Sequence, residues 1–247
     1  MAYDKIVDSG VLDGKLTAIA DAIRTKGGTT GELEFPDGFV SAVEGIQAGG
    51  GGDFLESWLA KTLEAVDSDV ECAIDESQFA FQANLKTVNL PNAVSYFGRD
   101  SAKAFSGCSA LERVNLGKIT KLNGRVFYGC TNLIEVIAPM VTESHDYVFG
   151  NCTAIEKLDF PSLTWLRYGN TFNGATKLHA LILRANQVVT LQNVNTFANT
   201  PFESGGTGGT VYVPSALIES YQTATNWSTL YAAGTCNFVA IEGSEYE

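Results

Sequence analysis

Three cysteines stand 22 residues apart in the same local sequence. The stretches AFSGCSALERVNLG, VFYGCTNLIEVIAP and VFGNCTAIEKLDFP place Cys108, Cys130 and Cys152 at one position of a repeated phrase. Equally spaced thiols could hold a metal, form disulfides or act as nucleophiles. They could instead be small buried side chains that fill one corner of each repeat, since free cysteine is among the most buried residue types.

Packing is the better explanation of this cysteine column. The fifth repeat carries Ala175 at the same position, and the first carries Gln82. Alanine is small and apolar but has no thiol chemistry. Stacking could bring the sulfurs within disulfide distance, yet three cysteines leave an odd one. No C-x-x-C pair occurs, and His145 and His179 lie far apart, so we expect no metal and no cofactor.

The sequence offers no other constellation that is typical of an enzyme. No serine stands in the G-x-S-x-G context of a nucleophile elbow. Arg113, Glu135 and Lys157 occupy one position of successive repeats and alternate in sign, which is typical of a mutually screened ladder of charges. The acidic stretch VDSDVECAIDES lacks the glycine and terminal glutamate of an EF-hand loop, which favours a solvated edge over a calcium site. We therefore expect no enzymatic activity.

Composition and charge limit the partners of the chain. Its 247 residues carry a formal net charge of −12, whereas a protein that binds nucleic acid needs a basic surface. No apolar run approaches the roughly 18 residues of a membrane span, so we expect no membrane insertion. The N-terminus MAYDKIVDSGVLDGKL does not have the basic start and apolar core of a signal peptide. We therefore expect synthesis in a cytoplasm.

Six repeats are marked by phenylalanines spaced 22 to 26 residues apart: Phe79, Phe105, Phe127, Phe149, Phe172 and Phe197. In the first five, leucine or isoleucine stands six positions later, and valine or leucine three beyond that. This L-x-x-(V/L)-x-(L/F) spacing is a leucine-rich repeat signature, with one strand per repeat. We expect a solenoid over 79–213, closed by Val211 and Val213 in the last strand. Caps are expected over 54–78, a short helix then a strand, and over 214–247, a helix and turn.

The N-terminal part predicts two short helices and a hinge. In KLTAIADAIRTKGG, apolar residues recur at helical spacing and a glycine pair follows them. In EFPDGFVSAVEGI, a proline precedes a second set of apolar residues at helical spacing. The glycines of AGGGGD predict a flexible hinge over 49–53. Helices this small need a neighbour to pack against, so we expect 1–48 to be an attachment or oligomerisation module. Its expected contact residues are Leu16, Ile19, Ile23, Phe39, Val43 and Ile46.

Two surfaces are candidates for binding a partner. The first is the outward face of the predicted strands, which mixes charged, amide and apolar groups. Its residues are Thr87, Asn89, Arg113, Asn115, Glu135, Ile137, Lys157, Asp159, Ala180 and Ile182. The second is an edge that follows the strands and is rich in aromatic side chains, which are enriched at protein interfaces. Its residues are Tyr96, Phe97, His145, Tyr147, Trp165, Tyr168 and Asn170.

Two parts of the sequence resemble known families. The phrase F-x-G-C-x-x-L-x-x-(V/L)-x-(L/F)-P and the closing segment TVYVPSALIESYQTATNWSTLYA are similar to BspA-type leucine-rich repeat proteins. The opening KLTAIADAIRTKGGTTGELEFPDGFVSAVEGI resembles a short module at the start of tail proteins in phages and prophages of Gram-positive bacteria. Together the resemblance covers roughly residues 15–232. It implies an α+β repeat protein, a BspA-like solenoid with a small N-terminal helical module.

The resemblance implies a phage tail-associated structural protein of the tail-fibre or receptor-binding type. Its partners would be other tail or baseplate proteins, further copies of itself in a homo-oligomer, and a glycan or protein on the bacterial surface. It would be located in the virion tail. Two alternatives remain: a bacterial cell-surface adhesin with the same repeats, and an architectural tail component without receptor contact. BspA-type repeats serve all of these, so the repeats alone do not decide among them.

Overall fold

The computed structural model describes residues 59–96, 103–203 and 205–247. The chain divides into two compact units, 1–60 and 61–247. Nearly all of the first unit, with the expected attachment helices and glycine hinge, lies outside the described residues. The same holds for the expected contact residues Leu16, Ile19, Ile23, Phe39, Val43 and Ile46.

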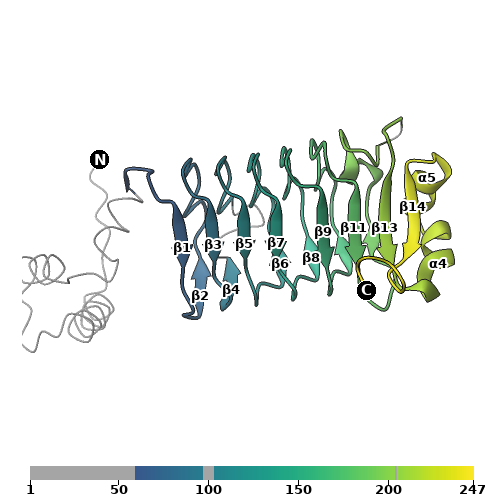
Figure 1. Cartoon of the computed structure of the whole chain (residues 1–247), viewed down its shortest axis with the longest axis horizontal. Coiled ribbons are helices and arrows are strands. Elements are labelled where there is room, and N and C mark those ends of the chain that lie inside the picture. The colour runs from purple at the N-terminus through teal and green to yellow at the C-terminus, as the bar shows by residue number, and fades with distance from the viewer. Residues whose placement is uncertain (1–58, 97–102, 204) are drawn as a thin grey trace, which may run out of the picture. The chain divides into compact units, whose positions relative to one another are not determined.

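The second unit is a stack of coils (Figure 1). Each coil begins with a turn that carries one of the six repeated phenylalanines, and coils 1 to 5 then continue into two short strands. We number the coils by these phenylalanines, from Phe79 in coil 1 to Phe197 in coil 6. Two strands, β1 and β2, precede coil 1.

The first strands of the coils form one side of the stack. One parallel ladder has the order β1-β3-β5-β7, and another contains β9, β11, β13 and β14 in that spatial order. Val88 pairs with Val114, and Val114 with Val136, so equivalent residues of successive repeats lie side by side with their side chains buried. The bounds are β1 (Ala65–Asp67), β3 (Thr87–Asn89), β5 (Arg113–Asn115), β7 (Glu135–Ile137), β9 (Lys157–Phe160), β11 (Ala180–Leu183), β13 (Gly209–Val213) and β14 (Cys236–Ala240).

Shorter strands form a second side, in the parallel ladders β2-β4 and β6-β8-β10-β12. Leu166 pairs with Leu191 and with Ser144, and all three side chains are buried. A polar serine therefore occupies one inward position of this row. The bounds are β2 (Cys72–Ile74), β4 (Ala93–Tyr96), β6 (Lys121–Leu122), β8 (Glu143–Ser144), β10 (Trp165–Leu166) and β12 (Thr190–Leu191).

The phenylalanine turns form the third side and supply a continuous aromatic column. Neighbouring rings from Phe79 to Phe197 stack with centroids 5.2 to 5.7 Å apart. All six rings are buried. The turns are also joined by backbone hydrogen bonds, since the N–H of Phe105 donates to the Val126 carbonyl and that of Phe127 to the Val148 carbonyl. Stacked rings and inter-coil hydrogen bonds thus fix each turn against the next.

Short helices close the C-terminal end of the stack. Trp227 is fully buried with its ring 5.8 Å from that of Phe197, and its Nε1–H donates to the Val189 carbonyl at 2.7 Å. The indole therefore covers the end of the aromatic column and satisfies its own polar atom. The short helices are η1 (Val194–Phe197), η2 (Ser215–Leu217), α4 (Ile218–Thr223) and α5 (Trp227–Ala232).

Both ends differ from the expected caps. Residues 65–67, at the end of the stretch expected to be a short helix, form β1, because Val66 pairs with Val88 and helps to cover the core of coil 1. At the other end, β13 is not the last strand. Phe238 of β14 pairs with Val211 and turns its side chain inward, which continues the ladder by one more strand.

Candidate functional site

The cysteine column is part of the core. Cys108, Cys130 and Cys152 are fully buried, and their thiols donate to the carbonyls of Phe79, Phe105 and Phe127 in the preceding coils, at 2.9 to 3.2 Å. Burial raises the pKa of all three thiols, that of Cys108 to about 11. The column therefore packs and hydrogen-bonds the turns to one another, and a reactive thiolate is disfavoured.

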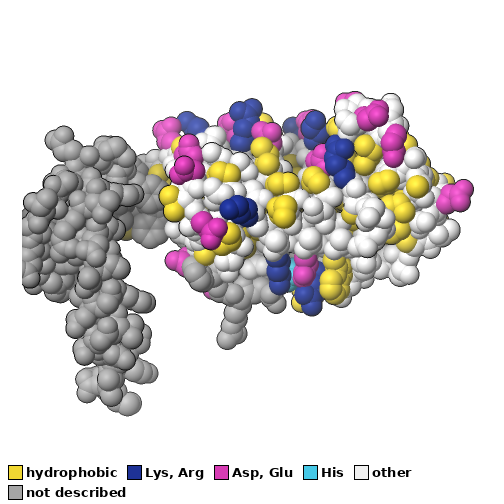
Figure 2. Space-filling view, turned by 90° about the horizontal axis from the view of Figure 1, so that it is seen from below, with side chains coloured by type: hydrophobic (Ala, Val, Ile, Leu, Met, Phe, Trp, Pro, Cys, Tyr) yellow, Lys and Arg dark blue, Asp and Glu magenta, His cyan; other side chains and the backbone are white. Residues whose placement is uncertain are grey.

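On part of the outward strand face, the side chains already bind one another across neighbouring strands. The Asn115 amide donates to Asn89, and the Asn89 amide donates to Asp67, both at 2.9 Å. Arg113 lies 3.2 Å from the Glu135 carboxylate, as the alternating signs predict. Acidic and basic side chains gather in neighbouring groups along the edges of the stack, with apolar side chains between them (Figure 2). Thr87 is exposed on the same face.

The C-terminal tail packs against another part of this face. The Tyr246 ring packs against Tyr212, with centroids 4.6 Å apart, and lies under the Lys157 ammonium. Arg184 makes a bidentate pair with Asp159 and also donates to the Tyr246 carbonyl at 2.7 Å. The tail leaves beside it a shallow depression of about 200 Å³, lined in part by Ile137.

The expectation that the whole row faces solvent is therefore wrong for two residues. Ala180 and Ile182 are buried, with only 2% and 1% of their surface exposed. All four residues of β11 are buried, so the strand has no outward face in contact with solvent. The apolar side chain of Ile182 is explained by the tail, because Ile182 and Tyr246 line the same depression.

The expected aromatic edge also requires a correction, because His145 is fully buried. Its Nε2 lies 2.5 Å from the Glu143 carboxylate, which also accepts from Arg167 at 2.8 Å and lies 3.9 Å from Lys121. Partial burial raises the pKa of Glu143, but the hydrogen bonds from Arg167 and His145, with the charge of Lys121, outweigh it and leave the pKa lowered. The imidazole is thus a structural partner of the carboxylate.

Trp165 and Tyr168 are exposed on this edge, and the Arg167 guanidinium lies over both rings, at 4.7 and 5.1 Å from their centroids. Tyr168 also packs its edge against the His145 ring. These aromatic side chains are therefore engaged with a cation that itself pairs with Glu143. Tyr147 does not belong to this cluster.

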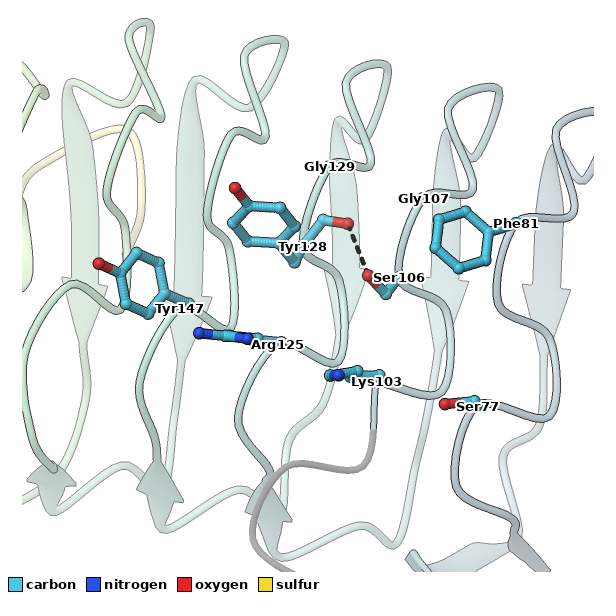
Figure 3. Close-up of a pocket in the computed structure, with 9 residues that line it drawn as sticks. All are labelled: Ser77, Phe81, Lys103, Ser106, Gly107, Arg125, Tyr128, Gly129 and Tyr147. Carbon is cyan, nitrogen blue, oxygen red and sulfur yellow. Dashed lines mark hydrogen bonds between the residues drawn. The ribbon is translucent and has the colours of Figure 1, made fainter.

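Tyr147 instead lines a groove on the phenylalanine side of the stack (Figure 3). The groove has a volume of about 610 Å³ and spans coils 1 to 4. Three aromatic rings, Phe81, Tyr128 and Tyr147, and two cations, Lys103 and Arg125, line it. We call this feature the turn groove. Ser77, Ser106, Gly107 and Gly129 complete its lining.

Left-handed backbone positions project these side chains into the turn groove. In coils 1 to 5 the residue two before the phenylalanine has a φ of 48 to 62°, and the residue two after it, in all six coils, has a φ of 55 to 77°. Such backbone favours glycine and asparagine. The first set is Ser77, Lys103, Arg125, Tyr147 and Asn170; the second is Phe81, Gly107, Gly129, Asn151, Gly174 and Asn199.

The bulky members of both sets meet in one place. Lys103, Arg125 and Tyr147 stand where coil 5 has an asparagine, and Phe81 stands where every other coil has glycine or asparagine. Each pays a conformational cost of order 1–2 kcal/mol that a glycine would not. All four line the turn groove, so the bulky members of these two sets converge on it.

Glycines make room for the rings. A β-carbon on Gly107 would lie 2.5 Å from the Phe81 ring, and one on Gly150 would lie 2.6 Å from the Tyr128 ring. Tyr128 meets Tyr147 edge-on, with centroids 6.2 Å apart. The rings of Phe81 and Tyr128 therefore lie against backbone and leave 69% and 37% of their residue surface exposed.

The turn groove carries positive charge on an acidic protein. Within the described residues, neither Lys103 nor Arg125 has an ion-pair partner. Arg125 lies 5.5 Å from the centroid of the Tyr147 ring, and its side chain is otherwise exposed. Two cations that have no ion-pair partner in the described residues, flanked by aromatic rings, suit an anionic group that also has an apolar part.

Sequence reasoning found one turn-groove residue, Tyr147, and missed Phe81, Lys103, Arg125 and Tyr128. A sequence signal was available for Phe81, since the other five coils have glycine or asparagine at its position, which indicates a left-handed backbone. At the position of Lys103 and Arg125, coil 5 is the only one of coils 1 to 5 with an asparagine, so no such signal exists there.

Two other kinds of site have no support in the described parts of the chain. In residues 59–96, 103–203 and 205–247, no three side chains of His, Cys, Asp or Glu gather closely enough to hold a metal ion. None of the helices described there has both the length and the apolar character that crossing a bilayer requires.

Comparison with known families identifies the repeats. A model of the BspA type leucine-rich repeat region matches six copies, in residues 66–116 and 99–212. No curated protein matches the chain. A solved leucine-rich cell surface protein from Faecalibacterium prausnitzii A2-165 is 17% identical, with a TM-score of 0.45, over 66% of this chain and 47% of that one. The chain thus spans less than half the length of that protein. Because the repeat model matches more than half of the residues, the protein belongs to the BspA type leucine-rich repeat family.

Proposed function

We propose that this protein is a non-enzymatic binding protein and that the turn groove is its contact site for a partner. The observation that carries the proposal is the convergence of four bulky left-handed residues, Phe81, Lys103, Arg125 and Tyr147, on one groove. Backbone strain of this kind persists when the surrounding structure or a function requires it. Aromatic and arginine side chains are also the usual anchors of protein interfaces.

We further propose that the protein is part of a phage tail and presents its repeats to the surface of a bacterial host. The resemblance of residues 15–46 to the opening module of tail proteins supports this setting. Residues 1–48 would join the protein to other tail proteins or to sister copies. Several copies on one tail would turn weak individual contacts into firm attachment through effective concentration.

The same repeat stack would also serve a bacterial cell-surface adhesin, as the family membership allows. Immunogold labelling of the producing strain separates the two settings. Label on the tails of particles released by lysis is the expected result. Label on intact cells, with unlabelled particles, would assign the protein to the cell surface instead.

Binding itself is tested with fluorescently labelled full-length protein and a panel of intact Gram-positive bacteria. We expect the wild type to sediment with cells of at least one strain. The double variant Lys103→Asn/Arg125→Asn should lose this association, whereas the control Lys177→Asn, which removes an exposed cation that does not line the turn groove, should keep it. If the wild type binds no strain in the panel, an architectural tail role without receptor contact becomes the better explanation.

A further inference from the structure

We propose that the turn groove recognises an acidic, extended segment of a partner protein that carries aromatic side chains among its carboxylates. This inference rests on the proposed binding function and specifies the ligand of the same site. It is drawn from the order of side chains along the stack, from their charge, and from the exposed rings at both ends of the groove.

The two cations lie in register. Lys103 and Arg125 occupy the same position of coils 2 and 3, and successive coils are joined by parallel hydrogen bonds at this side of the stack. Hydrogen bonds of this kind join neighbouring strands at a spacing of about 4.8 Å, and we expect a similar spacing between these turns. Two carboxylates on one extended chain can therefore meet both cations at once, with the guanidinium able to accept one of them in bidentate fashion.

Aromatic rings stand on both sides of this pair of cations. Figure 3 shows the side chains in two rows along the stack: Phe81 and Tyr128 lie in one row, and Lys103, Arg125 and Tyr147 lie in the other, with Phe81 at the coil 1 end of the groove and Tyr147 at the coil 4 end. Rings at both ends provide apolar contacts for side chains that flank the acidic residues. Coils 1 to 4 thus contribute in turn the Phe81 ring, the Lys103 and Arg125 cations and the Tyr147 ring, with Phe81 in the neighbouring row, and this order favours a ligand that lies parallel to the stack axis.

The charge of the whole protein argues against a polyanion. Long polyanions such as nucleic acids or acidic polysaccharides bind through many basic contacts. This chain has a net charge of −12, and the turn groove offers two cations. A short acidic run in a protein, attracted locally and anchored by aromatic contacts, matches that limited positive charge better.

Asparagine substitutions separate binding from folding at this site. Asn170 occupies the same left-handed position in coil 5, with a φ of 61°. Lys103→Asn and Arg125→Asn therefore remove the positive charges while keeping a residue type that this backbone favours. The double variant should be at least as stable as the wild type, so a loss of affinity cannot be attributed to unfolding.

The test uses a fluorescent random copolymer of glutamate and tyrosine, with polyglutamate and polygalacturonate as comparison probes. We expect the full-length wild type to bind the copolymer more tightly than polyglutamate. The affinity should fall by at least about tenfold in Lys103→Asn/Arg125→Asn and fall also in Phe81→Asn, but remain unchanged in Lys177→Asn. Rising salt should weaken binding.

Three results would overturn the proposal. Preference for polygalacturonate over the copolymer would assign an acidic glycan instead. Equal affinity of the double variant and the wild type would place the site elsewhere. Failure of the wild type to bind any probe would reject the acidic ligand. If the wild type nevertheless sediments with cells, the proposed binding function stands and only this inference about its ligand fails.

Discussion

The Phe81 ring of coil 1 lies against the α-carbon of Gly107 in coil 2, so closely that a β-carbon on residue 107 would come within 2.5 Å of it. Gly107 and Gly129 have the same left-handed φ, 75 and 76°, yet a β-carbon on Gly129 would meet nothing nearer than 3.8 Å. The two glycines therefore have the same backbone conformation but differ in one respect: an aromatic ring lies over Gly107, and no ring of the described residues lies over Gly129.

Gly107→Ala and Gly129→Ala should each lower the free energy of unfolding by about 1–2 kcal/mol, because alanine is strained in left-handed backbone. Only Gly107→Ala should be coupled to Phe81. In a double-mutant cycle with Phe81→Ala, measured by urea unfolding, we expect a coupling of about 1 kcal/mol for residue 107 and additive effects for residue 129. Equal coupling at both positions would contradict the contact.

Gly117→Ala should be more damaging, because its added β-carbon would lie 2.2 Å from the Pro91 carbonyl oxygen of the preceding coil. Backbone cannot swing aside as an exposed ring can, so the coils must separate. We expect a loss of about 2–3 kcal/mol in the free energy of unfolding. Gly169→Ala, where the nearest atoms would lie 3.8 Å away, is the matched control and should change stability by less than about 1 kcal/mol.

Native cysteines should differ in reactivity by position. Burial raises the pKa of Cys108 to about 11 and that of Cys236 to about 12, so about one thiol in a thousand or fewer is ionised at pH 8. Cys72 is less buried than the other four. With DTNB we expect one fast-reacting thiol in the folded protein, absent in Cys72→Ser, and five in concentrated guanidinium chloride. Rapid reaction of the cysteine column would show that the coils open readily.

Acid should weaken the fold in part through Glu143, whose pKa is lowered in the folded protein. Its carboxylate therefore stabilises the fold above the pKa of the unfolded state, and this contribution disappears as the pH falls through the folded-state pKa. Glu143→Gln should cost about 1–3 kcal/mol at pH 7, because it weakens the hydrogen bonds from Arg167 and His145.

The difference between Glu143→Gln and the wild type should shrink as the pH is lowered towards about 3, as measured by thermal unfolding across the range. Glu135→Gln is the control, since its pair with Arg113 is exposed and should contribute less than about 1 kcal/mol at pH 7. A constant difference for Glu143→Gln at all pH values would mean that the carboxylate charge is not what stabilises this cluster.

The proposed attachment role of residues 1–48 predicts an oligomer. Light scattering of the full chain should give a mass of three or more times 26.4 kDa. A chain that begins at Asp53, and so keeps the whole second compact unit, should be a monomer. If both chains are monomers, self-association is not the role of the N-terminal part, and docking on another tail protein would have to replace it.

The repeat spacing predicts the inward residues well, because buried positions recur in every coil. Phe127, Leu133 and Val136 lie in the core as expected, and Ala175 correctly indicates that the cysteine column is a packing feature. The alternation of inward and outward side chains along a strand predicts burial wrongly where a segment distant in the sequence covers the strand. Ile182 is buried near Tyr246, which follows it by more than sixty residues, and no local pattern could reveal that contact.

The turn groove escaped prediction for a different reason. Lys103 and Arg125 lie in turns, where the two-residue alternation of a strand does not say which side chains face solvent. His145 shows the converse error, since an imidazole near tyrosines suggests an interface, whereas the carboxylate of Glu143 holds it inside. In both cases contacts between neighbouring coils, rather than local sequence, decide whether the side chain is exposed or buried.

Coils of equal length can be gained or lost as whole units, both in the gene and in the fold. From Phe105 to Phe149 each coil adds 22 residues and repeats the same turn, column and strand positions. Each coil contacts mainly its two neighbours, so an in-frame duplication or loss of 22 codons would leave every ladder in register. Such an event would lengthen or shorten the turn groove by one side chain in each row, and recombination could thereby change the ligand while the fold is kept.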